Sequence, residues 1–531
     1  MSPILSFSQV IKIVRCRHSK SHLRKENPDV RFDVIPVFWP CQINTEMSID
    51  DVIYVICLLA CIGAGNYVRE VRDESQRKMM STALGVLVVV IVSGLHSLHC
   101  IASLALGTAS VLLVHPSKCH LVTFGIMFGY LVFFRLFDFY WSIPGHTNMI
   151  QMILTLKVSG IAFEKTAAWK RIREKDEQEK NEQRDVNSES PIEITDYDLE
   201  LQQLSAAEIV HYSLNYIGVL TGPYYRYRTY RDYFEMPFKT HAPSVGATIE
   251  KFKCAAFYSA LYLATNYVWP LDYALSDEFY NDRSFIYRLL YVWPTFFTFR
   301  ARIYTGLTLS ECVCTMAGFG AYPDDANANA GEGPRKRYQH LKRDADKHTY
   351  NFTTIVNTRV MDVERCWTFR EGMKHWNVCV QYWLAVNVYK LFPSKKYRTG
   401  ATLLCSAYWH GFRPGHYFCI MGAPFYVSLE DMWHKLVRKD ATGPGRTVID
   451  VLFWIFKWFA FSYLGVAFLL SSFGNIWRFY SSVYHIGYIS WAAMIGLGFF
   501  LTTQRKAAQR RRQKCAASGD TAVTVEDKKV Q

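Results

Sequence analysis

Long uninterrupted runs of apolar residues constrain the fold of this chain more than any other feature. A helix needs about 20 mostly apolar residues to cross the hydrocarbon core of a bilayer. Because backbone polar groups in lipid must be paired within their own segment, we expect such runs to be helical. The longest run should contain two spans, with a break around residues 94–99. The runs that meet or approach the required length are 52–68, 80–114, 121–141, 149–162, 255–275, 285–303, 401–429, 448–470 and 483–503.

The fold class that follows is all-α, a multi-pass transmembrane helical bundle of about eight to eleven spans. A soluble chain of 531 residues would be expected to divide into domains of roughly 150 residues, with apolar residues spread at helix or strand periods. The hydrophobic residues, which make up 50% of this chain, are instead concentrated in the long runs. The sequence therefore disfavours a soluble multidomain enzyme.

The net charge of +14 is explained by membrane topology rather than by nucleic-acid binding. Nucleic-acid recognition needs a basic patch on a folded soluble domain, and the sequence shows no such domain, so no nucleic-acid partner is expected. Lys and Arg accumulate in cytoplasmic loops and hold them there. Six cations without an acid follow the last apolar run, which places the C-terminus in the cytosol: Arg505, Lys506, Arg510, Arg511, Arg512 and Lys514.

The last four residues carry a candidate address. Lys528 and Lys529 stand fourth and third from the end, a position that resembles the dilysine signal read by retrograde coat proteins. A signal of this kind is read by a receptor and anchors nothing. The sequence therefore predicts residence in the endoplasmic reticulum membrane and recognition by a coat protein, with a chance pair of lysines in a charged tail as the alternative.

Composition divides the chain into an extension, a core and a tail. Residues 1–46 are mixed and basic and lack the apolar segment of a secretory signal, so we expect a poorly ordered extension that the chemistry does not need. The membrane core should span 47–505, interrupted by cytosolic or interfacial loops at 164–204 and 324–346. The first loop contains a charged stretch, 170–185, which indicates a solvated helix or a disordered segment. Gly and Ala in the second loop favour a mobile segment, and residues 506–531 form a basic cytosolic tail.

The cysteines predict neither a metal site nor a disulfide framework. Most of the 14 Cys lie inside apolar runs, where Cys packs as a small hydrophobe. Cys312 and Cys314 are too close together for the usual zinc knuckle. No metal and no resident cofactor is expected.

Polar residues inside apolar surroundings are the candidates for chemistry, because such residues usually face a bundle interior or a water-filled cavity. Asn377 and Gln381 lie one helical turn apart in an aromatic stretch, 376–383. His410 stands in an otherwise apolar run and is followed by Gly411. The imidazole could act as a general base near neutral pH, or it could be a packed histidine. Asn377 could orient a substrate or stabilise an oxyanion, or it could hydrogen-bond between helices.

These stretches resemble the Asn and His signatures of the membrane-bound O-acyltransferase family. The Asn signature is WNVCVQYW at 376–383, and the His signature is YWHG at 408–411. YIGVLTGPYYRYRTY at 216–230 is similar to the lysophospholipid branch of that family. AGFGAYP at 317–323 and LCSAYWHG at 404–411 are most similar to the members that use lysophosphatidylinositol. The resemblance covers about 47–505, outside the two loops.

The resemblance implies an enzyme that transfers an acyl chain from acyl-CoA, as a co-substrate, to the sn-2 hydroxyl of a lysophospholipid. The implied acceptor is lysophosphatidylinositol, and the implied donor carries a polyunsaturated chain such as arachidonoyl, as in phospholipid remodelling. The catalytic residues that it implies are His410 and Asn377, inside a membrane cavity. We expect their neighbours Gln381, Tyr408 and Trp409 to bind substrate.

Arginines near two of the motifs are candidates for binding the phosphates of CoA and of the lipid. Arg226, Arg228 and Arg231 alternate with tyrosines, and Arg pairs with phosphate and stacks on aromatic rings. Arg300 and Arg302 lie at the end of the 285–303 run. The alternatives are an aromatic and basic interface belt for the first group and side chains that extend to the membrane surface for the second.

Other functions are open at this stage. An acyltransferase of the same family could acylate another lysophospholipid or a protein and still use His410. A transporter or channel is disfavoured because transporters often contain inverted repeats or paired broken helices, and the sequence shows neither.

Overall fold

The computed structural model describes residues 49–137, 143–182 and 193–526. The predicted extension, residues 1–46, and the candidate address at Lys528 and Lys529 lie outside the described residues.

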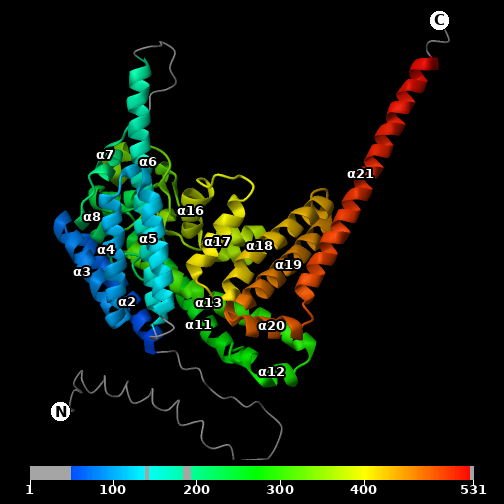
Figure 1. The fold of residues 1–531 in the computed structure, drawn as a ribbon, viewed down its shortest axis with the longest axis horizontal. Helices are drawn as coiled ribbons and strands as arrows, with labels where there is room; N and C mark the ends of the chain where they lie inside the picture. Colours follow the sequence, from blue (N-terminus) through cyan, green and yellow to red (C-terminus); the bar gives the residue numbers. More distant parts are fainter. Residues whose placement is uncertain (1–48, 138–142, 183–192, 527–531) are drawn as a thin grey trace, which may run out of the picture. The chain divides into compact units, whose positions relative to one another are not determined.

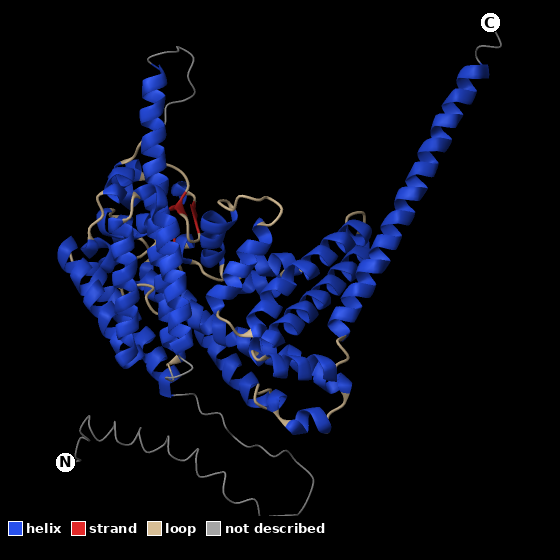
Figure 2. Ribbon diagram, in the orientation of Figure 1, coloured by secondary structure: helices blue, strands red, loops and turns tan. Residues whose placement is uncertain are grey.

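The described chain is almost entirely helical, with two pairs of two-residue strands (Figure 2). The strands β1 (Tyr322–Pro323) and β4 (Tyr350–Asn351) pair antiparallel, as do β2 (Ala328–Asn329) and β3 (Gly333–Pro334). Figure 1 labels most of the helices. The α-helices are α2 (Ile49–Glu70), α3 (Glu74–Ser93), α4 (Ser97–Leu113), α5 (Pro116–Phe137), α6 (Gly145–Glu182), α7 (Asp196–Gln202), α8 (Ala206–Ser213), α9 (Tyr227–Glu235), α10 (Phe238–His241), α11 (Ser244–Val268), α12 (Asp277–Asn281), α13 (Phe285–Met316), α14 (Val360–Arg365), α15 (Phe369–His375), α16 (Val378–Leu384), α17 (Arg398–His410), α18 (Pro414–Trp433), α19 (Gly443–Leu470), α20 (Phe473–Ser482) and α21 (Ile486–Glu526).

Short helices of other geometry connect these elements. The 3₁₀ segments are η3 (Gly94–His96), η4 (Tyr273–Leu275), η5 (Asp324–Ala326), η6 (Gln339–Lys347) and η7 (Thr353–Ile355). Two π-helical segments, η8 (Ala385–Tyr389) and η9 (His434–Arg438), continue α16 and α18.

The prediction of an all-α, multi-pass membrane protein is confirmed. Within the described residues, five helical stretches are long and apolar enough to cross a membrane: Ile49–Glu70, Glu74–Leu113, Pro116–Phe137, Gly443–Leu470 and Ile486–Lys514. One of these stretches, Glu74–Leu113, contains both α3 and α4, and the eight to eleven spans expected from the sequence also included runs that fall in shorter or less apolar helices. The run 149–162 is only the first part of α6, whose second half is charged, and the run 401–429 is divided between α17 and α18.

The predicted break in the 80–114 run is present at the expected place. α3 ends at Ser93, η3 follows, and α4 begins at Ser97. Gly94 has φ of 53°, a left-handed value that a residue without Cβ adopts at little cost.

α13 is the central element of the packing. It packs along α11 and also contacts α2 and α19. α6 packs against α4 and α5, and its apolar half is buried on every side, with Ile150, Leu154, Val158 and Ile161 inaccessible to solvent. α17, α18 and α19 pack in sequence against one another. Residues of α5, α15 and α17 line one common space.

Both predicted loops contain regular structure. The charged stretch continues α6 as far as Glu182. Within it, the ion pairs Arg173–Glu177 and Lys175–Glu179 have the one-turn spacing that stabilises a solvated helix. The helical interpretation of that stretch therefore holds up to this residue. The second loop, expected to be mobile, contains β2, β3, η5 and η6 and buries Tyr338. Its glycines permit this packing, because a Cβ at Gly331 would lie 3.1 Å from the Cα of Cys379.

Candidate active site

A single large cavity brings together the two residues that the sequence identified as catalytic. Its volume is about 1700 Å³, and both Asn377 and His410 line it. Most of its wall is apolar, with contributions from Phe134, Met152, Phe296, Phe299, Leu403, Phe461, Leu464 and Phe468. The cavity is therefore large enough and apolar enough to hold a fatty acyl chain beside a few polar groups.

His410 is the last residue of α17, and its position is fixed by its neighbours. Gly411 ends the helix with φ of 136°, a value that favours glycine. Trp409 is buried, and its indole N–H donates to the carbonyl of Met152 on α6 at 3.1 Å. The imidazole meets the edge of Phe468 from α19, with ring centroids 5.5 Å apart, and lies 6.0 Å from the ring of His416.

No hydrogen-bond partner for the imidazole of His410 is found among the described residues. A packed histidine normally has its ring nitrogens satisfied by protein groups. Here the ring nitrogens are available to a molecule in the cavity, which is the arrangement that a general base requires.

Asn377 occupies an unusual backbone position at the start of α16. Its φ is 52°, in the left-handed region, where Asn is one of the few tolerated side chains. Its N–H donates to the hydroxyl of Thr358 at 3.2 Å, and its side chain makes no capping bond. The side-chain amide is therefore available to the cavity that it lines.

Gln381 also lines the cavity, but its amide nitrogen is already used. It donates to the carbonyl of Met373 at 2.6 Å and to that of Trp376. These bonds fix the turn that leads from α15 to Asn377. Gln381 therefore supports the position of Asn377, in addition to any contact with substrate that the sequence suggested.

Tyr408 and Trp409 differ in their placement. Trp409 lines the cavity. Tyr408 is outside the set of lining residues and stacks on Phe128 of α5 and against Phe412, with ring centroids 6.1 Å and 5.6 Å apart. The predicted substrate contact of Tyr408 has no counterpart in this geometry, and its aromatic contacts attach α17 to α5.

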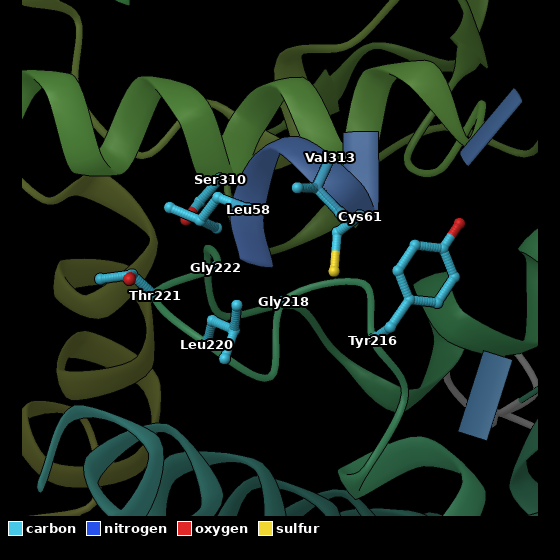
Figure 3. A pocket seen from close by; sticks show the side chains of 9 residues that line it. All are labelled: Leu58, Cys61, Tyr216, Gly218, Leu220, Thr221, Gly222, Ser310 and Val313. Carbon is cyan, nitrogen blue, oxygen red and sulfur yellow. The ribbon is translucent and has the colours of Figure 1, made fainter. Parts of the chain in front are cut away.

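The 216–230 motif contributes a tight turn to the cavity wall. Thr221 and Gly222 line both the large cavity and a small pocket. Gly218 has φ of 82°, and a Cβ at Gly222 would lie 2.0 Å from the Cα of Gly218. Figure 3 shows this turn with the residues that line the small pocket: Leu58, Cys61, Tyr216, Gly218, Leu220, Thr221, Gly222, Ser310 and Val313. The two glycines are thus required for the backbone to close on itself at the cavity wall.

The arginines of the same motif do not line the cavity and are paired with protein groups. Arg226 forms an ion pair with Glu164 at 3.1 Å. Burial alone would lower the pKa of Arg226, but the Glu164 carboxylate acts together with the nearby Tyr197, Tyr382 and Tyr224 to hold that pKa well above its usual value. Arg228 donates to the hydroxyl of Tyr338 at 3.1 Å and stacks over that ring.

Arg231 lies between two carboxylates, Glu200 at 2.7 Å and Glu235 at 2.8 Å. The structure therefore shows structural partners for all three arginines and does not bring them to the residues of the cavity.

The second predicted arginine pair is divided between two environments. Arg300 is buried, pairs with Glu364 at 3.2 Å and packs on Trp458, with the guanidinium carbon 3.9 Å from the ring centroid. Arg302 is half exposed and pairs with Asp51 of α2 at 2.7 Å. Neither lines the cavity.

The sequence interpretation missed Arg135, which lines the cavity beside His410. Arg135 belongs to α5 and contacts the end of α17 through its guanidinium. The signal was present, because a cation inside an apolar run is itself a functional candidate, and Arg135 lies within the 121–141 run.

The chain is similar to known membrane-bound O-acyltransferases. The model of the membrane-bound O-acyltransferase family matches residues 139–473. The membrane-bound acylglycerophosphatidylinositol O-acyltransferase frj of Drosophila melanogaster is 87% identical over 463 residues, which cover 87% of this chain and 95% of the relative. The membrane-bound acylglycerophosphatidylinositol O-acyltransferase of Xenopus laevis is 32% identical over 489 residues, 89% of this chain and 98% of the relative. That of Homo sapiens is 32% identical over 475 residues, 87% of this chain and 98% of the relative.

Proposed function

The chain belongs to the membrane-bound O-acyltransferase family, and we propose that it transfers an acyl chain from acyl-CoA to the sn-2 hydroxyl of lysophosphatidylinositol. The observation that carries the proposal is the shared cavity of His410 and Asn377, in which a base and an amide face an apolar space. The acceptor follows from the names of the relatives, each an acylglycerophosphatidylinositol O-acyltransferase.

In this reaction His410 takes the proton of the acceptor hydroxyl. The hydroxyl oxygen attacks the thioester carbonyl carbon, an ester bond forms, and the carbon–sulfur bond breaks. The proton passes from the imidazolium to the departing sulfur, which leaves as the CoA thiol. No acyl-enzyme is needed, because the hydroxyl attacks directly. The imidazole of His410, which has no partner in the described part of the chain, suits the role of proton carrier.

Asn377 contributes orientation and charge stabilisation. Its amide, held at the start of α16, donates to the oxygen of the reacting carbonyl as negative charge develops there. A fixed amide needs little reorganisation during the reaction, and the bonds made by Gln381 and Thr358 supply that fixation.

The apolar wall of the cavity accommodates the acyl chain, and we propose that a polyunsaturated chain such as arachidonoyl is preferred, as in phospholipid remodelling. Both substrates are amphiphiles, so a cavity inside the helical bundle lets CoA arrive from the cytosol while the lysolipid enters from the leaflet. Chain preference then depends on the length and the bend of the apolar space.

The test is an acceptor panel with the purified full chain. Lysophosphatidyl-inositol, -choline, -ethanolamine and -serine are each supplied with arachidonoyl-CoA, and the acylated products are quantified. Preference for lysophosphatidylinositol supports the proposal. A strong preference for another lysolipid would overturn the acceptor assignment and leave the family assignment intact, and acylation of a peptide in competition with lysolipid would favour a protein substrate.

We also propose that the chain resides in the endoplasmic reticulum with its C-terminus in the cytosol and that a coat protein reads Lys528 and Lys529. The basic residues that follow the apolar part of α21 support this orientation. A C-terminal epitope should be accessible when only the plasma membrane is permeabilised. Replacing both lysines with Ser should let part of the protein reach the Golgi, and unchanged reticular staining would place the retention signal elsewhere.

A further inference from the structure

Asn357 is a second amide at the cavity, and it lies outside the sequence motifs. It is buried and lines the cavity together with Asn377. In the described part of the chain, no group lies within hydrogen-bonding distance of its Oδ1. Buried polar side-chain atoms nearly always have a partner. The acceptor of Asn357 is therefore the kind of group that a bound molecule satisfies.

Backbone hydrogen bonds place Asn357 beside Asn377. The carbonyl of Asn357 accepts from the N–H of Val378 at 2.6 Å, and the N–H of Arg359 donates to the carbonyl of His375 at 3.0 Å. The segments around Asn357 and Asn377 therefore run alongside each other. Both amides reach the cavity from this pair of hydrogen-bonded segments.

A buried carboxylate fixes the segment that contains Asn357. Oε1 of Glu311, on α13, accepts from the N–H of Asn357 at 2.7 Å and from that of Thr358 at 3.4 Å. Its second oxygen pairs with Lys251 of α11 at 2.5 Å. Hydrogen bonds to a charged acceptor are among the stronger ones in proteins. The position of Asn357 is therefore set by the central helix of the fold, not by a free loop.

We propose that the side-chain amide of Asn357 binds hydroxyl groups of the acceptor headgroup and so selects a polyol headgroup over a choline one; this inference rests on the proposed function. An amide presents one acceptor and one two-proton donor side by side. Two adjacent ring hydroxyls, each of which donates and accepts, match that pair. The sn-2 hydroxyl has a single proton, which His410 takes, so the partner of the Oδ1 acceptor is a different hydroxyl.

The difference between an inositol and a choline headgroup should let Asn357 distinguish the two acceptors. The inositol ring carries several hydroxyls, whereas a choline headgroup carries none and would leave Oδ1 of Asn357 unsatisfied. A site built to hydrogen-bond a substrate hydroxyl strongly rejects an analogue that lacks it. Removal of the amide should therefore weaken use of lysophosphatidylinositol and leave use of lysophosphatidylcholine nearly unchanged.

The experiment compares Asn357→Leu, which keeps the size of the side chain and removes both hydrogen-bonding groups, with the unmodified full chain in the same detergent or nanodisc. We measure kcat/KM for lysophosphatidylinositol and for lysophosphatidylcholine, and KM for acyl-CoA. The ratio of the two kcat/KM values should fall about tenfold or more, with KM for acyl-CoA within about twofold. The matched control is Asn329→Leu, which removes an amide that pairs with Glu332 outside the cavity and should keep the ratio of the unmodified chain.

The outcomes separate this inference from the proposed function. If the unmodified chain prefers lysophosphatidylinositol and Asn357→Leu keeps that preference, the inference is overturned and the proposed function stands. A rise in KM for acyl-CoA alone also overturns it, because the amide would then contact the CoA arm. An unmodified chain that prefers lysophosphatidylcholine overturns both. If Asn357→Leu fails to fold, Asn357→Ala and Asn357→Ser replace it, and a retained preference in either folded variant counts against the inference.

Discussion

Arg135 of α5 donates through Nη1 to the backbone carbonyl of Tyr408 at 2.9 Å and so ties one helix to the end of another. Its second terminal nitrogen donates to the carbonyl of Trp409, and its Nε donates to the side chain of Asn148 at 3.1 Å. The last carbonyls of a helix lack partners within the helix. A cation near these carbonyls also interacts favourably with the helix dipole. Arg135 therefore fixes the turn that carries His410.

We predict that Arg135→Gln lowers kcat while KM for both substrates changes little. The imidazole would lose its fixed position, and a displacement of about 1 Å at a reacting group costs about 10²-fold in rate. Arg135→Lys, which keeps the charge but can hold fewer carbonyls, should recover part of the loss. Steady-state kinetics of the purified variants check this prediction.

Arg302→Gln is the matched control, because it removes an exposed arginine whose partner Asp51 lies away from the cavity. Its kcat should stay within about twofold of the unmodified chain, since exposed ion pairs contribute little. If Arg135→Gln folds and turns over at the normal rate, Arg135 has no role in positioning His410.

The second prediction concerns the two residues of the proposed chemistry. His410→Ala should lose about 10²- to 10⁴-fold in kcat, because a general base contributes that much. Asn377→Ala should lose about 10²- to 10³-fold if its amide donates to the oxyanion. Their losses should not add in the double variant, since both act on one transition state.

These variants must be compared at equal folding, which the elution profile of the full chain and its thermal transition report. Near-normal acyl transfer by a folded His410→Ala protein would leave a packed histidine on a membrane helix as the correct interpretation. Additive losses would instead mean that His410 and Asn377 act in separate steps.

Local sequence signals predicted the features that depend on local chemistry. The apolar runs predicted the helical class, and the break at Gly94 followed from a glycine inside one run. The motif residues His410 and Asn377 lie at one cavity in the structure. The runs counted from hydropathy include 149–162, which in the structure is the first part of α6, a helix that continues into a charged second half.

Features that depend on distant partners could not be predicted. The alternation of Arg and Tyr suggested a phosphate site, but Glu164 and Glu200, which pair with Arg226 and Arg231, are far away in sequence. Asn357 lies in a segment without periodicity, and its place at the cavity depends on bonds to distant residues: its N–H donates to Glu311, and its carbonyl accepts from the N–H of Val378. A single sequence does not show which of its polar residues are in contact in the folded protein.

The third prediction distinguishes a structural role of the arginine motif from a role in phosphate binding. Arg226→Gln should reduce the free energy of unfolding by about 3 kcal/mol, because Glu164 would be left buried without its cation. Arg231→Gln should change it by less than about 1 kcal/mol, since the pairs of Arg231 are nearer the surface. Thermal unfolding in detergent measures both. A folded Arg231→Gln protein with a raised KM for acyl-CoA or lysolipid would instead favour phosphate binding by this motif.

The fourth prediction tests the glycine turn at the cavity wall through two alanine substitutions. A Cβ at Gly222 would lie 2.0 Å from the Cα of Gly218, so Gly222→Ala must displace backbone and should destabilise the chain by about 1–3 kcal/mol. Because Gly222 lines the cavity, kcat/KM should fall as well. Gly246→Ala is the control: it lies in α11 with no atom within 4 Å of a new Cβ, and alanine is favoured over glycine in a helix by roughly 0.5–1 kcal/mol. Equal thermal transitions for the two variants would show that the turn can relax and that its glycines are not required for the cavity wall.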